Sequence, residues 1–536
     1  MDSRGAMQRL GGAARSFVAT QKLRLLVAGF CVAMSLVGVL RSDLSVRDET
    51  RVAGIAQEML LEGQLAWPRL NGQPFLEYPS LGYLPSVAVL ASAGNGHDAL
   101  LLLPSALAGL LTLALTFAMG RWIAGEAAGL VAALVLQCSM GFLALHDRLL
   151  VDPWLLCWIS LSLAGFVLQE ATPRRRGTGL ALFYLGMGGA FLTKGVIGVA
   201  IPTAVAGSYL LAVGGPSRIA SIARRVFHPS LLLLPIPILI WAVAAQEVAG
   251  SGAMQAVLHQ SAQRFLSNHA DHAAPFYAYA DRLLYLSAPA VILLPGLAWQ
   301  WLNPDRRRRA LAAGGPLDLL SPIWFAVVLI GLSAASSKRN LYLAPLYPAL
   351  ALAVGVAYAR ARDGAYAPRP LATLLRWADR LPASPVVLLV LMLALRSLFH
   401  FAVTVPGVEA RSARPLFTAV RSWLEEHPEG RVALLTQSEG MEGAAVYYLG
   451  RVPGVAPAGS GRGQEFERPI VLVGCGELPV GVKEGNPAAA AGLRFWPIGS
   501  DRCWTRVLAP APARLSVQAS LTPTPRPPDP RHRVPR

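Results

Sequence analysis

The stretch that decides the fold reads DALLLLPSALAGLLTLALTFAMG and occupies residues 98–120. Only its first residue is charged, and about 20 consecutive apolar residues are enough for a helix to cross a bilayer. Further apolar runs compatible with spanning helices lie at residues 23–40, 124–144, 153–168, 178–192, 196–213, 229–246, 284–302, 317–335, 341–358 and 385–404. The sequence therefore predicts an α-helical multi-span membrane protein with about 11–13 transmembrane helices.

The composition agrees with this class. Of the 536 residues, 54% are hydrophobic and only 15% are charged, whereas about a quarter of an ordinary soluble domain is charged. This balance excludes a soluble cytosolic enzyme. The net charge of +17 does not indicate nucleic-acid binding, because the basic residues occur in short clusters between apolar runs, as orientation signals do.

These basic clusters predict the topology, since positively charged residues accumulate on the cytoplasmic side of a membrane. A cytoplasmic N-terminus and an odd number of spans place the C-terminal segment outside the inner (plasma) membrane, in the periplasm or the extracellular space. The apolar run at 81–93 is short and contains Pro85, so it is predicted to be juxtamembrane or re-entrant. The predicted cytoplasmic clusters lie at residues 15–24, 121, 174–176, 218–225, 306–309 and 360–380.

The chain divides into three predicted parts. Residues 1–404 form the membrane domain, in which 41–97 is the first outer loop with its juxtamembrane helices and 248–283 is the fourth outer loop. Residues 405–521 are predicted to form a small extracytoplasmic α/β domain, with helices at 415–426 and 443–449 and strands at 432–435 and 470–473. The Pro- and Arg-rich residues 522–536 are predicted to be disordered.

Two cysteines of the C-terminal segment allow two interpretations. If their domain is extracytoplasmic, Cys475 and Cys503 could form a disulfide. The sequence favours the other interpretation, in which they are two unrelated small buried residues, as free cysteines often are.

Acidic residues stand at two predicted outer segments. Asp48, Glu49 and Arg51 open a helical stretch in the first outer loop, and Asp152 precedes a proline at the mouth of a span. Carboxylates at these positions suit catalysis, but acids also cap and charge helix N-termini. Each site therefore carries a capping alternative.

Lysine is rare in this chain, which uses arginine almost everywhere. Lys194 lies between two apolar runs with hardly any loop, where a charge costs a few kcal/mol unless it reaches the interface or finds an anion. Lys338 and Arg339 repeat this arrangement at a second predicted outer turn. The alternative for that second turn is simple anchoring of a span end at the membrane surface.

The predicted fourth outer loop carries polar and aromatic residues. Arg264 lies in the sequence Gln-Arg-Phe, and His259 and His272 lie at irregular spacing, which is only a weak pattern for a metal site. Taken together, acids, histidines and cations gather on one membrane face. That combination suits a lipid whose phosphate lies at the surface, because transfer from a lipid phosphate needs cations to hold the developing negative charge.

With these residues assembled, the chain resembles the bacterial polyprenyl-phosphate-sugar-dependent glycosyltransferases of GT-C fold. The nearest group in that resemblance contains the lipid A aminoarabinose transferase, and the protein O-mannosyltransferases are more distant. The residues that carry it are Asp48-Glu49-Thr50-Arg51, Glu58-Met59, Gly63, Pro68 and Gly72; Val151-Asp152-Pro153; Leu192-Thr193-Lys194-Gly195 and Pro202; Gln263-Arg264-Phe265, His272 and Ala274-Pro275-Phe276-Tyr277; and Lys338, Tyr342, Pro345 and Pro348.

The resemblance implies an integral-membrane enzyme that moves a sugar from undecaprenyl phosphate, or a similar carrier, to a lipid, glycan or protein acceptor at the outer face of the inner membrane. It implies that Asp48 and Asp152 are catalytic. It also implies one divalent metal ion (Zn, Mg or Mn), held by Glu77 and His272, with His259 as an alternative ligand. Residues expected to face the donor phosphate or the acceptor are Glu49, Arg51, Tyr78, Lys194, Arg264, Lys338 and Arg339.

Three positions depart from the family's pattern. Tyr78 stands where the family commonly has lysine, Leu102 stands where an arginine is frequent, and Ser261 stands where a histidine is expected. These changes concern the donor contacts and the metal. They keep open a relative that binds the carrier lipid without catalysis.

A transporter or flippase for lipid-linked sugars is the alternative from another functional class. Transporters carry internal repeats and polar residues near the middle of the membrane. Here the conspicuous polar residues are predicted at one face, which favours the transferase.

Overall fold

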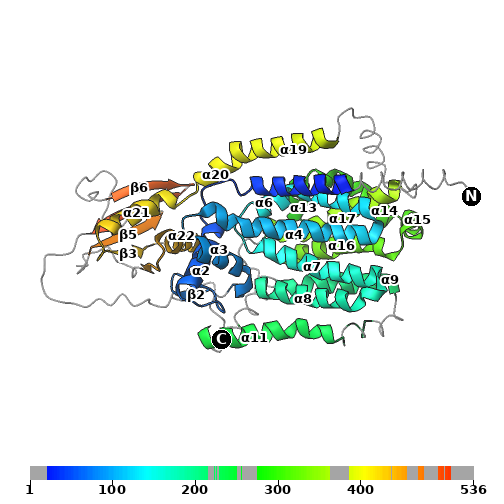
Figure 1. Ribbon diagram of the computed structural model, residues 1–536, viewed down its shortest axis with the longest axis horizontal. Coiled ribbons are helices and arrows are strands. Elements are labelled where there is room, and N and C mark those ends of the chain that lie inside the picture. Colours follow the sequence, from blue (N-terminus) through cyan, green and yellow to red (C-terminus); the bar gives the residue numbers. More distant parts are fainter. Residues whose placement is uncertain are drawn as a thin grey trace, which may run out of the picture.

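The computed structural model describes residues 21–75, 77–214, 228–249, 274–362, 385–435, 438–455, 469–475, 493–499 and 501–508, together with 222, 223, 225 and 255. A bundle of long helices forms the larger part, and a small mixed sheet with its helices lies beyond one end of it (Figure 1). The fold is thus the predicted helical membrane domain followed by a C-terminal α/β unit.

Each of the eleven expected apolar runs falls on a helix or on a pair of helices. Within the described residues, seven helices are long and apolar enough to cross a membrane, or up to nine if each of two bent pairs counts as one span. The other two runs are the helix at residues 21–37 and the glycine-rich α8. The helices of the bundle are α4 Asp98–Ala124, α5 Glu126–Gln137, α6 Met140–His146, α7 Asp152–Ala171, α8 Arg176–Lys194, α9 Ile197–Gly214, η4 Pro229–Leu233, α11 Pro235–Ala249, α13 Tyr279–Leu286, η5 Ala290–Leu293, α14 Leu294–Leu302, η6 Pro316–Leu319, α16 Leu320–Ala334, η7 Asn340–Leu343, α17 Leu346–Arg362 and α19 Pro385–Phe399.

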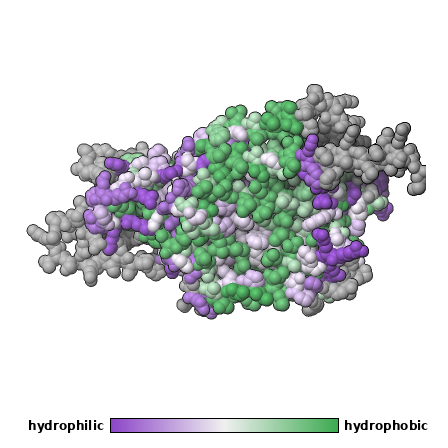
Figure 2. Space-filling view, in the orientation of Figure 1, coloured by the Kyte–Doolittle hydropathy of each residue, from purple (hydrophilic) through white to green (hydrophobic). Residues whose placement is uncertain are grey.

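Apolar side chains cover the visible face of the bundle in a broad band, and hydrophilic side chains gather at both of its ends (Figure 2). The arginine-rich helix α15 (Pro304–Gly314) lies at the end of the bundle opposite the sheet (Figure 1). This segregation is the one expected of a bundle that lies across a bilayer.

Two expected spans are sharply broken. The axis bends by 68° between α5 and α6, and by 114° between α13 and the helical segment 290–302. The two breaks meet, because the amide of Met140 donates to the carbonyl of Ala288 over 3.1 Å and the hydroxyl of Ser139 donates to that of Leu286 over 3.3 Å. The apolar pattern gave no indication of a bend at either place.

The first outer loop forms helices that lie beyond the bundle end. They are α2 (Asp48–Leu61) and α3 (Leu84–Ala93), and a short hairpin of β1 (Arg69–Leu70) and β2 (Gln73–Pro74) lies between them. Helix α3 has only ten residues and is too short to span, in agreement with the juxtamembrane prediction. The amides of Asn71 and Gly72 donate to the buried carboxylate of Glu58 and so hold the hairpin on α2.

The C-terminal unit is a five-stranded sheet in the order β4-β3-β5-β7-β6, in which β3 runs parallel to β4 and β5, and β7 runs antiparallel to its two neighbours. A disulfide joins Cys475 of β5 to Cys503 of β7, which decides between the two interpretations of these cysteines. Three of its strands, β4, β6 and β7, were not predicted from the sequence. The elements are α20 Val405–Glu409, α21 Arg414–Glu426, β3 Arg431–Leu434, α22 Glu439–Leu449, β4 Gly454–Val455, β5 Ile470–Cys475, β6 Leu493–Ile498 and β7 Asp501–Leu508.

This unit shares a hydrophobic core with the first outer loop. Val52 and Ile55 of α2 belong to the same buried cluster as Tyr447 of α22, Leu434 of β3 and Val471 of β5. The C-terminal unit and α2 therefore fold as one packed layer, which matters because α2 begins with Asp48.

Candidate active site

Asp48 is the first residue of α2 and follows a residue in an unusual conformation. Arg47 has φ 114° and ψ −106°, a combination that is costly for a residue with a side chain and that persists only where the surrounding structure imposes it. The carboxylate of Asp48 contacts arginines, and Arg47 at the N-cap makes no side-chain capping bond. The observed contacts of the Asp48 carboxylate are thus with arginine side chains.

Three guanidinium groups surround the carboxylate of Asp48. Its Oδ1 lies 3.1 Å from Nη2 of Arg51, and its Oδ2 lies 2.9 Å from Nη2 of Arg339 and 3.7 Å from Nη2 of Arg148. Burial alone would raise the pKa of Asp48, but the arginine charges outweigh it and lower the pKa below its ordinary value. Asp48 therefore stays ionised and acts as the counter-ion of these arginines.

Glu49 points elsewhere. Its side chain is buried, pairs with Arg41, and accepts hydrogen bonds from the backbone amides of Ser45 (2.7 Å) and Leu149 (3.1 Å). These contacts fasten the first outer loop to the segment before Asp152. Glu49 does not line the cavity described below. Its contacts are structural, and its expected contact with a substrate stays a prediction.

Asp152 and Lys194 form a second ion pair. Nζ of Lys194 lies 2.5 Å from Oδ1 of Asp152, and both side chains are only 9% exposed. Two aromatic rings flank the ammonium, with centroids at 5.0 Å for Tyr78 and 5.6 Å for Tyr342, within the range of cation–π attraction. The carboxylate and the two rings therefore offset the free-energy cost of burying the Lys194 charge between two apolar runs.

Arg339 lies between these two centres. Burial acts to lower the pKa of its guanidinium, but Asp48, Tyr342, Tyr78 and Asp152 together raise it. One cation thus interacts with both predicted catalytic carboxylates, and the structure brings Asp48, Asp152, Lys194, Tyr78 and Arg339 into one neighbourhood.

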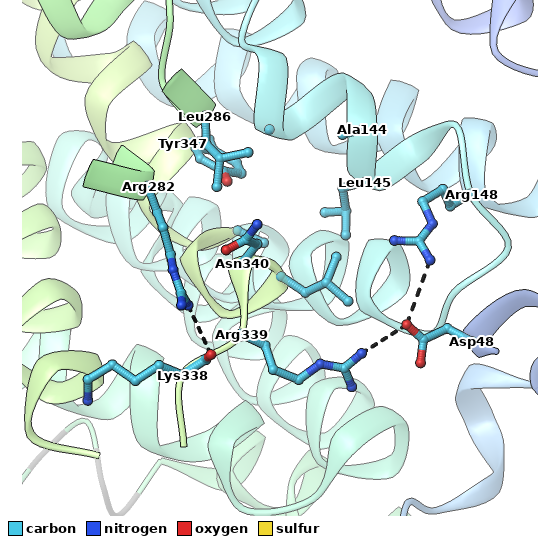
Figure 3. Close-up of a pocket in the computed structure, with 13 residues that line it drawn as sticks. Asp48, Ala144, Leu145, Arg148, Arg282, Leu286, Lys338, Arg339, Asn340 and Tyr347 are labelled. Atoms are coloured by element: carbon cyan, nitrogen blue, oxygen red, sulfur yellow. Dashed lines mark hydrogen bonds and ion pairs between the residues drawn. The ribbon is translucent and has the colours of Figure 1, made fainter. Parts of the chain in front are cut away.

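A cavity of about 410 Å³ opens beside Asp48 (Figure 3). Asp48, Arg148 and Arg339 meet on one side of it, joined by the ion pairs described above. Arg282 of α13 reaches across the opposite side and donates to the carbonyl of Lys338 over 2.9 Å. The remaining lining residues are mostly apolar: Gly141, Ala144, Leu145, Leu286, Asn340, Leu341, Ala344 and Tyr347.

The broken helices explain this cavity. Helix α6 and helix α13 turn away from their spans and supply Ala144, Leu145, Arg282 and Leu286 to the wall. Four polar lining residues were not predicted as site residues from the sequence: Arg148, Arg282, Asn340 and Tyr347. A usable signal was present for Arg282, because it is a basic residue on the predicted outer side, against the usual bias.

Lys338 lines the cavity, but its ammonium turns away from it (Figure 3). Nζ donates to the carbonyls of Ala335, Ser333 and Leu332 at the end of α16. A cation at this place is stabilised by the free carbonyls and the dipole of the helix C-terminus. The anchoring alternative therefore describes Lys338 better than the expected phosphate contact does.

The remaining predicted residues are only partly covered. Arg264, His259 and His272 lie outside the described residues, and Glu77 lies 3.9 Å from Arg51. In the part of the chain that the structure describes, no three His, Cys, Asp or Glu side chains are grouped closely enough to hold a metal. Of the expected ligands only Glu77 can be located, and an arginine neighbours it, so the metal stays a prediction.

Comparisons with known proteins show what this chain is similar to. The family model described as dolichyl-phosphate-mannose-protein mannosyltransferase matches residues 87–243. An undecaprenyl phosphate-α-4-amino-4-deoxy-L-arabinose arabinosyl transferase of Pseudomonas fluorescens is 30% identical over 325 residues, which are 58% of this chain and 55% of the relative. The enzyme of the same name from Edwardsiella ictaluri is 29% identical over 310 residues, with 57% and 54% covered. The chain thus spans about half the length of the curated relatives it matches.

The fold also has a solved counterpart. The crystal structure of ArnT from Cupriavidus metallidurans bound to undecaprenyl phosphate superposes with a TM-score of 0.71 and 18% identity, and the match covers 92% of this chain and all of that one. This likeness shows the fold alone. The family-model match and the curated relatives bear out the resemblance that the sequence indicated.

Proposed function

We propose that this protein is an integral-membrane glycosyltransferase that moves a sugar from a polyprenyl-phosphate donor to an acceptor at the outer face of the inner membrane. The observation that carries the proposal is the cavity beside Asp48, which combines an apolar wall with Asp48 and two of the arginines that pair with it, Arg148 and Arg339. Such a wall suits an isoprenoid chain, and the guanidinium groups suit its phosphate. The names of the related enzymes, which act on undecaprenyl phosphate sugars, support the same substrate class.

The proposed reaction is a displacement at the anomeric carbon of the sugar. The acceptor oxygen or nitrogen attacks that carbon, the bond from carbon to the phosphate oxygen breaks, and the polyprenyl phosphate leaves with the electron pair. Arg148 and Arg339 hold the negative charge that develops on the leaving phosphate. The proton lost by the acceptor goes to Asp48.

Donor binding prepares Asp48 for this role. In the free protein, Arg148 and Arg339 neutralise the Asp48 carboxylate at 3.7 and 2.9 Å. A phosphate that recruits these arginines weakens their contacts with Asp48, so its pKa rises toward the ordinary value. Asp48 thereby changes from a counter-ion into a competent proton acceptor only when the donor is present.

Asp152 has a supporting part in this proposal. It fixes the ammonium of Lys194 at 2.5 Å, next to the rings of Tyr78 and Tyr342. A lysine held in this way adds fixed positive charge near the leaving phosphate without a reorganisation cost during the reaction. The metal ion expected from the resemblance remains an untested addition to this set.

The orientation is part of the proposal: the N-terminus lies in the cytoplasm, and the cavity and the C-terminal unit lie outside. The arginine-rich α15 lies at the opposite end of the bundle from the sheet. The disulfide between Cys475 and Cys503 is of a kind that persists in oxidising compartments such as the periplasm. Both observations support this orientation.

Purified protein in lipid nanodiscs, supplied with polyprenyl-phosphate sugars and membrane extracts as acceptors, tests the function. The expected result is release of polyprenyl phosphate by the wild type and at least a hundredfold slower release by Asp48→Asn. Binding of undecaprenyl phosphate is measured separately, and Asp48→Asn should bind it at least as tightly because its arginines lose their counter-ion. Binding without release in the wild type would favour the non-catalytic alternative, and sugar-lipid transfer between leaflets without release would favour the flippase.

A further inference from the structure

The C-terminal unit reaches the candidate site through one side chain. Oε2 of Glu439, in the first turn of α22, lies 2.8 Å from Nη1 of Arg51, and Nη2 of the same arginine lies 3.1 Å from Oδ1 of Asp48. Arg51 thus bridges a carboxylate of the C-terminal unit and the predicted catalytic carboxylate. The Arg51 side chain is only 15% exposed and packs over the ring of Phe75 at 5.7 Å, so its position is well defined.

The backbone around this bridge is tightly packed. A Cβ on Gly440 would lie 2.5 Å from the backbone nitrogen of Arg47, the residue with the costly φ of 114°. The hydroxyl of Thr50 donates to the carbonyl of Gly440 over 2.7 Å. The start of α22 therefore rests on the turn of chain that aims Asp48.

Glu439 also places a negative charge beside the guanidinium of Arg51. Two of the carboxylates near this guanidinium, Glu77 and Asp48, belong to the first outer loop, and Glu439 is the one supplied by the C-terminal unit. A guanidinium donates in fixed directions within its plane. A contact on Nη1 therefore restrains the orientation of the guanidinium, and with it the position of Nη2 relative to Asp48.

We infer that Glu439 is a positioning residue for the transferase reaction, which acts through Arg51 to hold Asp48 toward the cavity and to limit how strongly Arg51 stabilises its charge. This inference rests on the proposed function. Without the negative charge of Glu439, Arg51 turns more completely to Asp48, draws the carboxylate from the cavity and favours its ionised form. The C-terminal unit is then a part of the active site.

The experiment measures turnover and its pH dependence for Glu439→Gln in nanodiscs. We expect kcat to fall about tenfold, less than the roughly hundredfold that a full 1 Å displacement of a reacting group can cost, with little change in KM. The acid limb of the kcat profile should move to lower pH, because Asp48 is easier to ionise beside a less engaged Arg51. Glu439→Asp keeps the charge and should retain the wild-type acid limb with a smaller loss of kcat.

Two control variants separate this role from general damage. Glu425→Gln removes the same charge from α21, away from the cavity, and should leave kcat and the pH profile unchanged. Tyr448→Phe removes a 2.8 Å hydrogen bond to Asp98, which also ties the C-terminal unit to the bundle, but far along α22 from Arg51. It should lower the melting temperature without moving the acid limb.

A double-variant comparison tests the route through Arg51. In an Arg51→Gln background, Glu439→Gln should have no further effect on kcat, because residues that act through one group are not additive. Additive losses, or a Glu439→Gln profile equal to that of Glu425→Gln, would overturn the inference while the transferase function stands. A wild-type protein that releases no polyprenyl phosphate would overturn the function itself, and the inference with it.

Discussion

Asp48 has a protonation behaviour that depends on what its arginines contact. In the free protein they lower its pKa below the ordinary carboxylate value of about 4. A donor phosphate competes for Arg148 and Arg339 and leaves Asp48 with less positive charge nearby. The same carboxylate should therefore titrate at two different values, one for the free protein and one for the donor complex.

The pH dependence of the reaction follows from this competition. A group with a lowered pKa stays charged as the pH falls, until the pH reaches that lowered value. The acid limb of kcat/KM, which reports the free protein, should therefore lie below about pH 4. The acid limb of kcat, which reports the complex, should lie at higher pH, and steady-state rates measured between about pH 3 and 8 would show the separation. Coincident limbs would contradict the exchange of arginines from Asp48 to phosphate.

The pair of Asp152 and Lys194 makes a separate prediction about stability. Both side chains are 9% exposed, and removal of one partner leaves an uncompensated buried charge, which costs about 3–5 kcal/mol. Lys194→Met and Asp152→Asn should each lower the melting temperature in nanodiscs clearly. The double variant should be more stable than the sum of the two losses predicts. Strictly additive losses would mean that the two charges do not interact.

Residue types in the sequence predicted part of this site. Lys194 was identified because a charge between two apolar runs is costly and needs a reason, and Arg339 because it lies in a second turn of the same kind. Asp48 and Asp152 were assigned as catalytic by the family resemblance. Glu49 could not be separated from Asp48. Adjacent side chains of a helix point about 100° apart, but which of the two faces the cavity depends on how the helix docks. The carbonyls that hold Lys338 were equally invisible, because backbone groups at a helix end leave no mark in the sequence.

At the scale of elements, apolar length predicted the spans well and their continuity poorly. Every expected run falls on helical structure, but two of them bend by 68° and 114°. A hydropathy pattern reports how apolar a segment is and not whether its axis is straight. These bends matter for function because α6 and α13 form much of the cavity wall.

The crossing of α2 and α22 was also beyond the sequence, and it allows a direct test. A Cβ on Gly54 would lie 2.4 Å from Cα of Gly443, so the two helices touch through their backbones. Gly54→Ala should force them apart and destabilise the protein by about 1–3 kcal/mol, seen as a lower melting temperature and faster proteolysis of the C-terminal unit. Gly331→Ala is the matched control, because nothing lies within 4 Å of its Cβ. Equal behaviour of the two variants would contradict the close crossing.

At the scale of the whole molecule, charge distribution separates the two ends. The sheet lies beyond one end of the bundle, and the arginine-rich helix α15 lies at the other (Figure 1). In the proposed orientation, a lipid phosphate at the outer surface would be level with the cavity while its isoprenoid chain stays in the bilayer. The overall polarity of the molecule was readable from the sequence, since it depends on counts of residues and not on contacts.

Cysteine labelling of intact cells tests this orientation. Glu426→Cys places a thiol on exposed α21, and Arg308→Cys places one on exposed α15. A membrane-impermeant maleimide should label the first from outside and the second only after the membrane is opened. Cys31 and Cys157 are buried and should react with neither treatment. Labelling of Arg308→Cys in intact cells would contradict the proposed orientation.

The transferase function itself is tested by mass spectrometry of polyprenyl-phosphate lipids in a deletion strain, with complementation by the wild type, by Asp48→Asn and by Glu425→Gln. We predict that one polyprenyl-phosphate sugar accumulates in the deletion strain and in the Asp48→Asn strain and returns to its basal level with the other two. That lipid would identify the donor. Clearance of the lipid by Asp48→Asn as fully as by the wild type would contradict the proposed role of Asp48 and its arginines.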